Sequence, residues 1–262
     1  MTTQTATDDA PVLAIQGLVK RFRSITAVDG VDLTIRPGEF VGLIGPNGAG
    51  KTTTMRCISG ELAPDEGSVT VGGVSTTDAP IKARAQLGYV PQELELYRYL
   101  TGEEFLRFVA DVRGVPEGRQ DRRLEELLEL TELTEARNRI IREYSGGMAR
   151  KIAIAAALIA RPPLLLLDES FVGLDPESTF ALRQYLVEFC RQGGAVVLSS
   201  HILDMVERTC DRVVILAAGQ IRRDLDADQL KEALGPDGEH ETLTELYLET
   251  TAPWRSRLGG DG

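Results

Sequence analysis

Residues 40–55, FVGLIGPNGAGKTTTM, decide the fold of this chain. The run from Phe40 to Ile44 is apolar apart from one glycine, which is typical of a strand buried in a sheet. Residues 45–52, GPNGAGKT, match the pattern G-x-x-x-x-G-K-[ST], in which a strand leads through a glycine-rich loop into a helix. The stretch therefore predicts a phosphate-binding loop in an α/β fold.

The residue types of this loop explain its chemistry. Glycines allow backbone N–H groups to point inward around phosphate oxygens, where side chains would clash. The following helix presents its positive N-terminal end to the same phosphates. Lys51 can reach the outer phosphates, and the hydroxyl of Thr52 can coordinate Mg²⁺. The nucleotide-binding residues predicted here are Gly45, Pro46, Asn47, Gly48, Ala49, Gly50, Lys51, Thr52 and Thr53.

A second apolar run, Leu164 to Leu167, ends in the acidic pair Asp168-Glu169. An acid at the carboxyl end of a parallel strand lies in the crevice where ligands bind. We expect Asp168 to hold Mg²⁺, directly or through water, and Glu169 to polarise a water molecule against the γ-phosphate. A carboxylate directly after the metal-binding aspartate favours hydrolysis over transfer to an acceptor. The sequence also lacks the Asn-Lys-x-Asp stretch typical of guanine recognition, so ATP hydrolysis is the predicted reaction.

The composition restricts the class of protein. The 262 residues suit one large domain or a domain with an inserted subdomain. The formal net charge of −11 argues against a nucleic-acid surface, which needs clustered Lys and Arg. The three cysteines stand too far apart for a C-x-x-C pair and are read as reduced thiols. The longest apolar run, residues 152–160, is about half a membrane span, so we expect a soluble chain whose work at a membrane requires a partner.

Apolar runs at 12–15, 31–35, 67–73, 195–198 and 212–216 predict further strands. Several of them do not alternate, which indicates a parallel sheet covered on both faces. Between about 94 and 160 the pattern becomes helical, with Phe105, Phe108, Val109 and Val112 at the spacing of one helix face. A second, charged helix carries its leucines at 124, 127 and 128. We expect residues 1–10 to be disordered and residues 236–262 to form a polar tail with an amphipathic piece at 243–248.

With these motifs in place, the chain resembles the nucleotide-binding subunit of ATP-binding cassette (ABC) transporters over about residues 11–235. Residues 45–53 look like the Walker A loop and residues 164–169 like the Walker B strand. Four other stretches look like the Q-loop, the signature loop, the D-loop and the switch histidine; they are VPQ at 90–92, YSGGM at 144–148, GLD at 173–175 and His201. The resemblance implies a P-loop NTPase (RecA-like) core with a parallel sheet, an N-terminal antiparallel β subdomain and an inserted helical subdomain at about 94–160.

The resemblance also implies roles for individual residues and the cofactors ATP and Mg²⁺. Gln92 would contact Mg²⁺ and the attacking water, and His201 would contact the γ-phosphate. An aromatic ring stacks on adenine where Phe22 stands, with Val28 nearby as an alternative. Each ATP would lie between the Walker A loop of one subunit and the signature loop of the other, which implies a homodimer or a heterodimer. The residues expected to reach the second subunit's nucleotide are Ser145, Gly146, Gly147 and Asp175.

Two departures from the family pattern stand out. Met148 replaces the glutamine common at the end of the signature, which removes one side-chain hydrogen bond but keeps the serine hydroxyl and the glycine N–H groups. Residues 170–172, SFV, stand where a proline-containing turn is frequent, which puts the local turn in doubt.

The stretch LYRYLT at 96–101 and the late amphipathic piece resemble those of ABC-2-type exporter subunits. We therefore expect a separate transmembrane permease as partner, which would place the chain at the inner face of the cell membrane, and no nucleic-acid partner. An ABC importer subunit is the alternative. A soluble ABC mechanoenzyme acting on nucleic acid or ribosomes is disfavoured by the acidic charge, the single cassette and the absence of a coiled-coil insertion.

Overall fold

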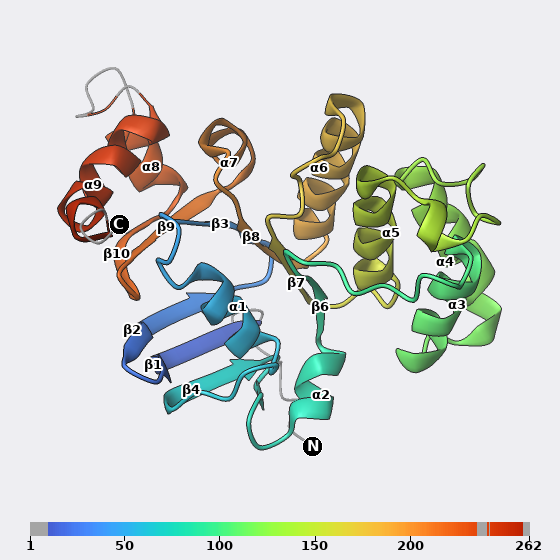
Figure 1. The fold of residues 1–262 in the computed structure, drawn as a ribbon, viewed down its shortest axis with the longest axis horizontal. Helices are drawn as coiled ribbons and strands as arrows, with labels where there is room; N and C mark the ends of the chain where they lie inside the picture. The colour runs from blue at the N-terminus through green and yellow to red at the C-terminus, as the bar shows by residue number, and fades with distance from the viewer. Residues whose placement is uncertain (1–9, 235–239, 241, 259–262) are drawn as a thin grey trace, which may run out of the picture.

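The computed structural model describes residues 10–234, 240 and 242–258, with side chains up to residue 254. Its elements form two sheets and a group of helices to one side (Figure 1). Helix α1 (Lys51–Ile58) contacts strands of both sheets and so lies between them. The disorder expected for residues 1–10 falls almost entirely outside the described residues.

The smaller sheet is antiparallel and matches the antiparallel β subdomain expected at the N-terminal end. Its strand order is β2-β1-β4-β5, built from β1 (Leu13–Phe22), β2 (Ile25–Ile35), β4 (Glu66–Val71) and β5 (Val74–Ser75). The first two strands extend well beyond the apolar runs that predicted them. Their outer halves form a hairpin whose register shifts interrupt the alternation of buried and exposed residues, so no regular apolar pattern marks them.

The larger sheet has the order β10-β9-β3-β8-β7-β6 and is parallel except for its edge strand β10. Its strands are β3 (Phe40–Ile44), β6 (Leu87–Val90), β7 (Leu164–Asp168), β8 (Ala195–Ser199), β9 (Arg212–Ala217) and β10 (Gln220–Leu225). Every residue of β3, β7 and β8 is buried. This confirms the parallel sheet predicted from apolar runs that do not alternate.

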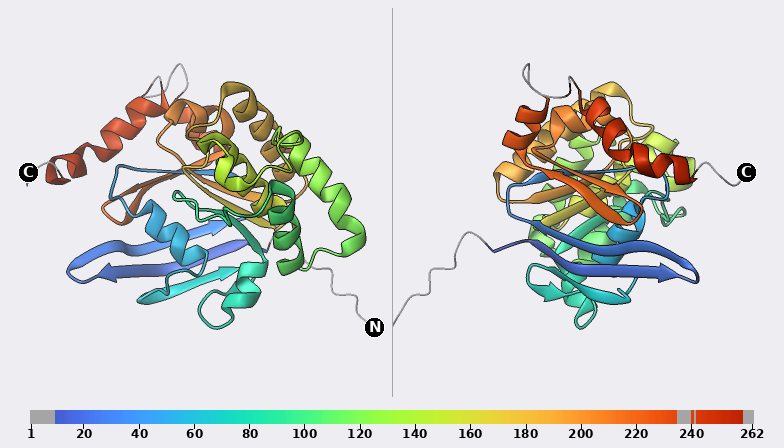
Figure 2. Two further views of the ribbon diagram at one scale, coloured as in Figure 1. Left: turned by 45° about the vertical axis from the view of Figure 1, so that its right-hand side comes forward. Right: turned by 90° about the vertical axis from the view of Figure 1, so that its left-hand side faces the viewer.

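Two hydrophobic clusters explain why those runs are apolar at every position. In β7, Leu165 and Leu167 join the cluster on the helical side, whereas Leu164 and Leu166 join the cluster between the two sheets. Successive side chains of a strand point to opposite faces. Because both faces are covered, each residue of the strand needs an apolar side chain. Figure 2 shows the two sheets as separate layers.

The helical insertion contains α3 (Gly102–Val112), α4 (Glu117–Leu130), the 3₁₀ turn Ile141–Glu143 and α5 (Gly146–Leu158). A capping box between Thr101 and Glu104 begins α3. The predicted buried face of α3 is partly wrong: Phe105 is buried, but Phe108 and Val112 are exposed. The buried side instead includes Leu106 and Ala110. The three leucines of α4 are fully buried, as predicted.

The remaining helices are α2 (Pro80–Ala85), α6 (Pro176–Arg191), α7 (Leu203–Thr209), α8 (Ala227–Ala233) and α9 (Leu243–Leu258). Helix α9 lies in the stretch expected to be a polar tail. It contacts α7 and β9 and buries Leu243 and Leu246 in the hydrophobic cluster on the helical side. The backbone N–H of Leu243 donates to the carboxylate of Glu207 at 2.9 Å. The amphipathic piece at 243–248 is therefore the beginning of a packed helix.

Candidate active site

The glycine-rich loop joins β3 to α1, as the opening pattern predicted. A Cβ on Gly45 would lie 2.2 Å from the carbonyl oxygen of Leu216, so the backbone there has room only for glycine. Gly50 has a φ of 104°, and its Cβ would lie 2.4 Å from the carbonyl oxygen of Ala27. A Cβ on Gly48 would meet nothing within 4 Å. The loop is thus wedged against two strands and open on one side.

Lys51 is buried at the start of α1, under the loop. Its Nζ donates hydrogen bonds to the carbonyl oxygens of Gly45 at 2.7 Å and Pro46 at 3.2 Å. Burial lowers the pKa of the ammonium group, and the nearby charges of Glu169 and Asp168 oppose that shift. The loop therefore encloses one positive charge, held by backbone carbonyls and facing two carboxylates.

Asp168 ends β7 and has no exposed surface. Neither of its carboxylate oxygens makes a hydrogen bond of ordinary geometry with the described residues. Burial raises the pKa of this carboxyl group, while the nearby hydroxyls of Ser199 and Thr52 favour the carboxylate and oppose the rise. A buried carboxylate without a partner is costly unless something neutralises it. Its oxygens and the Thr52 hydroxyl are the hard donors that Mg²⁺ prefers.

Within the described residues, no group of three or more His, Cys, Asp or Glu side chains could hold a metal ion. A site with one carboxylate and one hydroxyl still fits Mg²⁺, since this ion is commonly held by one or two carboxylates together with substrate phosphates and water. The residues present therefore fit a magnesium–nucleotide complex better than a metal held by protein alone.

Glu169 and His201 meet where the neighbouring strands β7 and β8 end. Asp168 pairs with Ser199 in the parallel register, so the residues that follow each strand lie side by side. The carboxylate of Glu169 contacts Nδ1 of His201. Glu169 also takes a positive φ of 52°, and its N–H donates to the carbonyl oxygen of Ser199 at 3.0 Å. His201 is largely exposed and Glu169 largely buried. The predicted base and the predicted switch histidine are thus in contact.

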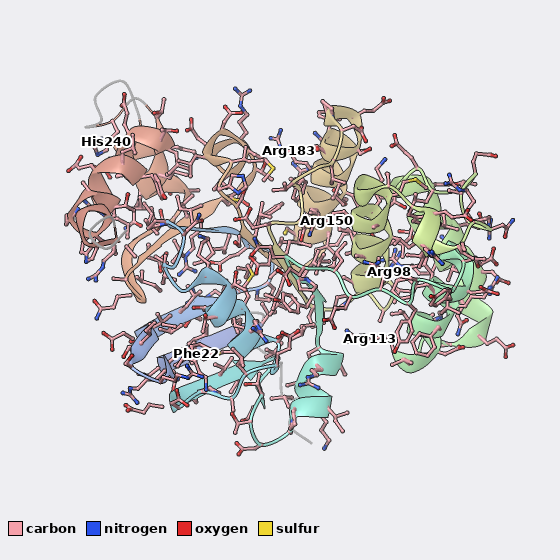
Figure 3. All side chains as sticks on the ribbon, in the orientation of Figure 1. Phe22, Arg98, Arg113, Arg150, Arg183 and His240 are labelled. Atoms are coloured by element: carbon pink, nitrogen blue, oxygen red, sulfur yellow. The ribbon has the colours of Figure 1, made fainter. Side chains whose placement is uncertain are left out.

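Gln92 follows β6, the neighbour of β7, and its side chain is exposed. Its backbone carbonyl accepts a hydrogen bond from Nη1 of Arg150 at 3.1 Å, and Pro91 accepts from the same atom at 3.4 Å. Burial lowers the pKa of the Arg150 guanidinium. Arg150 lies on α5, whose first turn carries the signature loop (Figure 3). Sequence reasoning missed this residue, because only folding brings it to the predicted Q-loop.

The two candidates for contact with adenine differ in exposure. Phe22 ends β1 with 43% of its surface exposed, and Nζ of Lys20 lies 5.7 Å from its ring centre. Figure 3 labels Phe22 on the four-stranded sheet. Val28 is fully buried in the cluster between the sheets. Of the pair, only Phe22 offers a surface to a ligand.

Ser145 is the N-cap of α5, and its Oγ accepts a hydrogen bond from the N–H of Met148 at 3.2 Å. Ser145 and Gly146 are exposed, and a Cβ on Gly146 would meet nothing within 4 Å. A Cβ on Gly147 would lie 3.0 Å from the carbonyl oxygen of Gly173, so the signature loop backs onto the D-loop. The side chain of Met148 packs against the hydrophobic cluster on the helical side. Met148, which replaces the glutamine common in the family, therefore contributes to packing.

Asp175 is the N-cap of α6 and accepts hydrogen bonds from the N–H and the hydroxyl of Ser178, at 2.8 and 2.6 Å. These bonds hold the pKa of its carboxyl group far below the usual range, and the bond from the hydroxyl has the largest effect. Nζ of Lys151 lies 3.4 Å from Asp175 and 2.6 Å from Glu132. Lys151, a second residue that the sequence did not single out, thus links the signature helix to the D-loop.

The turn at residues 170–172, after the Walker B strand, forms without a proline. Ser170 is fully buried, and its hydroxyl donates to the carbonyl oxygens of Val90 and Asp168. Phe171 is buried in the cluster on the helical side, and the N–H of Val172 donates to the carbonyl oxygen of Glu169. The positive φ angles of Glu169 and Gly173 reverse the chain here.

The predicted site residues therefore fall into two groups. The loop at 45–53, the acidic pair after β7 and His201 gather at the carboxyl ends of the parallel strands. The signature loop at 144–148 stands apart on the helical insertion. Among the described residues, no hydrogen bond or ion pair joins it to the glycine-rich loop of its own chain. One chain presents two halves of a site that it does not bring together.

Comparison with known proteins assigns the family. The family model described as "ABC transporter" matches residues 28–172. The linearmycin resistance ATP-binding protein LnrL of Bacillus subtilis is 39% identical over 210 residues, which are 80% of this chain and 68% of that protein. The Nod factor export ATP-binding protein I of Ralstonia nicotianae is 35% identical over 210 residues, 80% of this chain and 65% of that protein.

Solved structures agree with these relatives. The ATP-binding subunit of an ABC transporter superimposes with a TM-score of 0.86 at 36% identity, over 92% of this chain and 99% of that one. A dimeric ATP-binding cassette in a post-hydrolysis state, bound to ADP and Pi, matches with a TM-score of 0.76 at 27% identity, over 82% of this chain and 98% of that one.

The described part of the chain contains no helix that is both long and apolar enough to span a bilayer. ABC ATPase subunits dimerise and work with transmembrane partners. The matched family model, the relatives and the folded site together show that this chain belongs to the ABC transporter family, as an ATP-binding subunit that hydrolyses ATP.

Proposed function

We propose that this chain is one of two ATPase subunits that drive an ABC-2-type exporter through a separate membrane permease. The observation that carries the proposal is the division of the site. The signature loop is exposed and its helix is capped by Ser145. Within the part of the chain that the structure describes, it makes no polar contact with the glycine-rich loop of its own chain. A second subunit that supplies its own signature loop completes each site, which makes ATP binding and dimerisation one event.

The first group of residues would bind and cleave the nucleotide. The backbone N–H groups of residues 47–53 surround the phosphates. Lys51 exchanges its two carbonyl partners for phosphate oxygens, and Phe22 stacks on the base. Thr52, Asp168 and Gln92 would hold Mg²⁺, which when bound neutralises charge on the phosphates. Glu169 accepts the proton of the attacking water, and His201, in contact with Glu169, orients that carboxylate and reaches the γ-phosphate.

The second group would act on the nucleotide bound to the partner subunit. Ser145, with Gly146 and Gly147, presents a hydroxyl and the N–H groups of a helix start, which suit an anion. Asp175 is held beside this loop by its ion pair with Lys151, which lies on the signature helix. Arg150 connects the same helix to the carbonyls of the Q-loop, so movement of Gln92 and of the signature helix would be coupled.

Replacing Ser145 by arginine is expected to abolish ATP hydrolysis without weakening ATP binding to the isolated subunit. The larger cation would block the approach of the partner's phosphates, whereas the nucleotide-binding loop of the same chain is untouched. Hydrolysis rates and the affinity for ATP should be measured separately. The variant also loses a helix cap, worth about 1 kcal/mol, so its thermal unfolding should be recorded. Ser68→Arg, at an exposed position on β4, is the matched control. A normal hydrolysis rate in Ser145→Arg would refute the role in trans.

An exposed aromatic surface beside Gln92 supports the membrane partner. Tyr97, Tyr99 and Phe108 are exposed, and the rings of Tyr97 and Phe108 pack edge to face with centres 5.1 Å apart. A hollow of about 180 Å³ lies next to them, lined partly by Leu94, Leu96 and Val109. Contiguous exposed apolar groups of this kind mark interaction surfaces. A short apolar helix of a permease would fit there, next to the loop that contacts the nucleotide.

Phe108→Asp is expected to reduce capture of the permease from detergent-solubilised membranes by about tenfold or more, because an exposed aromatic anchor commonly contributes more than 1.4 kcal/mol to an interface. Affinity purification of the tagged chain, followed by identification of the membrane protein, provides the measurement. Ile81→Asp, at an exposed position on α2, is the control. Equal capture by wild type and Phe108→Asp would place the permease elsewhere.

The same purification separates the alternatives. A permease with about six apolar spans and no extracellular binding protein supports export. LnrL and the Nod factor export protein, by their names, serve resistance and export, which favours that outcome. Recovery of an importer permease with a substrate-binding protein would favour the importer, and recovery of RNA without any membrane protein would favour the mechanoenzyme.

A further inference from the structure

The helical insertion contains a second hollow that the ATPase site does not use. Its volume is about 570 Å³, and it lies between the link from α3 to α4, the first turns of α4 and the end of α5. Five arginines and one glutamate line it, in a chain whose formal net charge is −11. The charged lining residues are Arg113, Arg119, Arg122, Arg123, Arg161 and Glu126. We call this hollow the arginine pocket.

The arginine pocket lies near the amino ends of the parallel strands, whereas the nucleotide loop lies at their carboxyl ends. Nη1 of Arg113 donates to the carbonyl oxygen of Leu87, the first residue of β6, at 3.0 Å. Arg161 stands just before Leu164, where β7 begins. Both arginines thus lie at the amino ends of parallel strands, whereas the glycine-rich loop and Asp168 lie at carboxyl ends. The pocket is therefore separate from the ATP site.

The positive charges of the pocket exceed what its glutamate can neutralise. Glu126 pairs with Arg123 at 2.7 Å and with Arg161 at 3.2 Å. Arg113, labelled in Figure 3, lies below α5 in that view. Its guanidinium donates only to backbone carbonyls and has no carboxylate partner within the described residues. Burial accordingly lowers the pKa of its guanidinium. Arg119 and Arg122 are exposed, and their side chains make no hydrogen bond or ion pair with any described residue.

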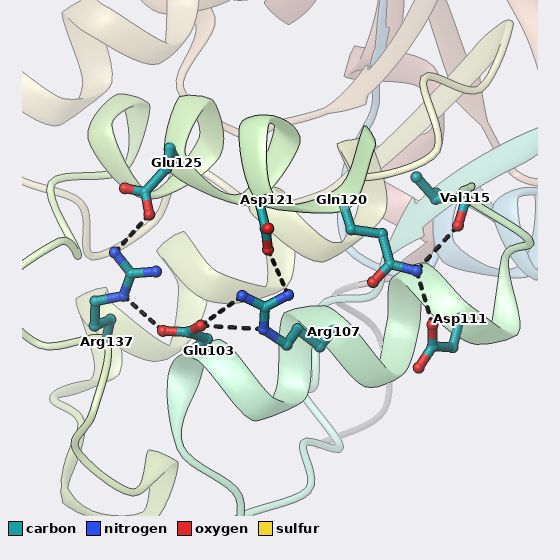
Figure 4. A network of polar contacts seen from close by, with 8 residues as sticks. All are labelled: Glu103, Arg107, Asp111, Val115, Gln120, Asp121, Glu125 and Arg137. Carbon is teal, nitrogen blue, oxygen red and sulfur yellow. Dashed lines mark hydrogen bonds and ion pairs between the residues drawn. The ribbon is translucent and has the colours of Figure 1, made fainter. Parts of the chain in front are cut away.

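The sequence of α4 explains why nearby acidic side chains do not neutralise the arginines of the pocket. Arg119, Arg122, Arg123 and Glu126 follow the i, i+3, i+4, i+7 spacing of one helix face. Three nearby acids, Asp111 on α3 and Asp121 and Glu125 on α4, are already paired elsewhere, as Figure 4 shows. Asp121 binds Arg107 and Glu125 binds Arg137, both at 2.7 Å, while Asp111 accepts from Gln120 at 2.7 Å.

We propose that the arginine pocket binds a small ligand that carries a phosphate or pyrophosphate group. Arg113, Arg119 and Arg122 have no carboxylate partner among the described residues. Three such guanidinium groups suit a phosphate group, whose several oxygens can accept from several guanidinium forks at once. The volume falls within the range of small-molecule sites. Val115, Pro116, Ile159 and Ala160 add apolar walls for the remainder of the ligand.

The test is calorimetric titration with inorganic pyrophosphate at fixed ionic strength. Because the glycine-rich loop would also bind this probe, the Lys51→Ala chain is the background. That chain should bind one pyrophosphate, and adding Arg119→Gln and Arg122→Gln should weaken the binding at least tenfold. Adding Arg208→Gln and Arg223→Gln, two exposed arginines on α7 and β10, removes the same charge and should change the affinity less than twofold.

A second arm identifies the source of the phosphate. Flotation with phosphatidylcholine vesicles containing phosphatidic acid is measured for the same variants. Dependence on Arg119 and Arg122 in the vesicle arm alone supports the phosphate site and assigns it to a lipid head group. If the binding of pyrophosphate depends on Arg119 and Arg122, a soluble phosphate ligand is supported. Equal binding by all variants in both arms overturns the proposal, as does the absence of binding to either phosphate probe.

Discussion

Replacing Glu169 by glutamine is expected to lower the rate of ATP hydrolysis by about 10²- to 10⁴-fold, the usual contribution of a positioned general base. Glutamine keeps the size of the side chain and the contact with His201 but cannot accept the proton of the attacking water. It leaves Lys51, Thr52 and Asp168 in place, so ATP should still bind. The variant should therefore accumulate the state in which two subunits enclose uncleaved ATP.

Two measurements test this expectation. The hydrolysis rate reports the missing base, and size-exclusion chromatography in saturating ATP should show a dimer that the nucleotide-free variant does not form. Glu129→Gln, at an exposed position on α4, should behave as the wild type. A variant that stays monomeric with bound ATP would contradict the enclosure of nucleotide between two chains. Hydrolysis at the normal rate would place the base elsewhere.

The elements that the sequence predicted well are those whose pattern is local. The strand, loop and helix around Lys51 follow from consecutive residues, because each glycine and the lysine act within one turn of chain. The buried strands β7 and β8 are recognisable because both faces of the sheet are covered. The hydroxyl of Ser145 caps α5, and serine is a residue type commonly found at this helix position.

The elements that were missed depend on what folding places beside them. Strand β10 is polar because it forms the edge of the sheet. The amphipathic piece at 243–248 was predicted, but its packing in α9 against α7 and β9 was not. Phe108 has the spacing of a core residue but lies on the exposed side of α3, next to Tyr97. Arg150 and Lys151 follow the signature motif after Ala149. Nothing in their sequence indicates that one reaches the Q-loop and the other the D-loop.

Replacing Lys51 by alanine is expected to weaken ATP binding by about 10²-fold or more. Hydrogen bonds to charged groups contribute about 1.5–3 kcal/mol each, and a factor of ten in affinity corresponds to about 1.4 kcal/mol. In the structure, Nζ of Lys51 lies within the loop and donates to two backbone carbonyls, so it is poised to transfer both bonds to phosphate oxygens. Binding of ATP by the purified chain, measured by calorimetry, gives the affinity directly.

The same lysine also supports the loop, so a loss of binding has two possible causes that must be separated. If Lys51 acts on the phosphates, the variant should lose most of its affinity for ATP while its affinity for adenosine, which Phe22 and the four-stranded sheet would contact, changes little. If the loop collapses, both affinities fall and the thermal unfolding temperature drops. Lys82→Ala, at an exposed position on α2, removes the same charge far from the loop and should alter neither affinity. Unchanged affinity for ATP in Lys51→Ala would refute its role in binding phosphate.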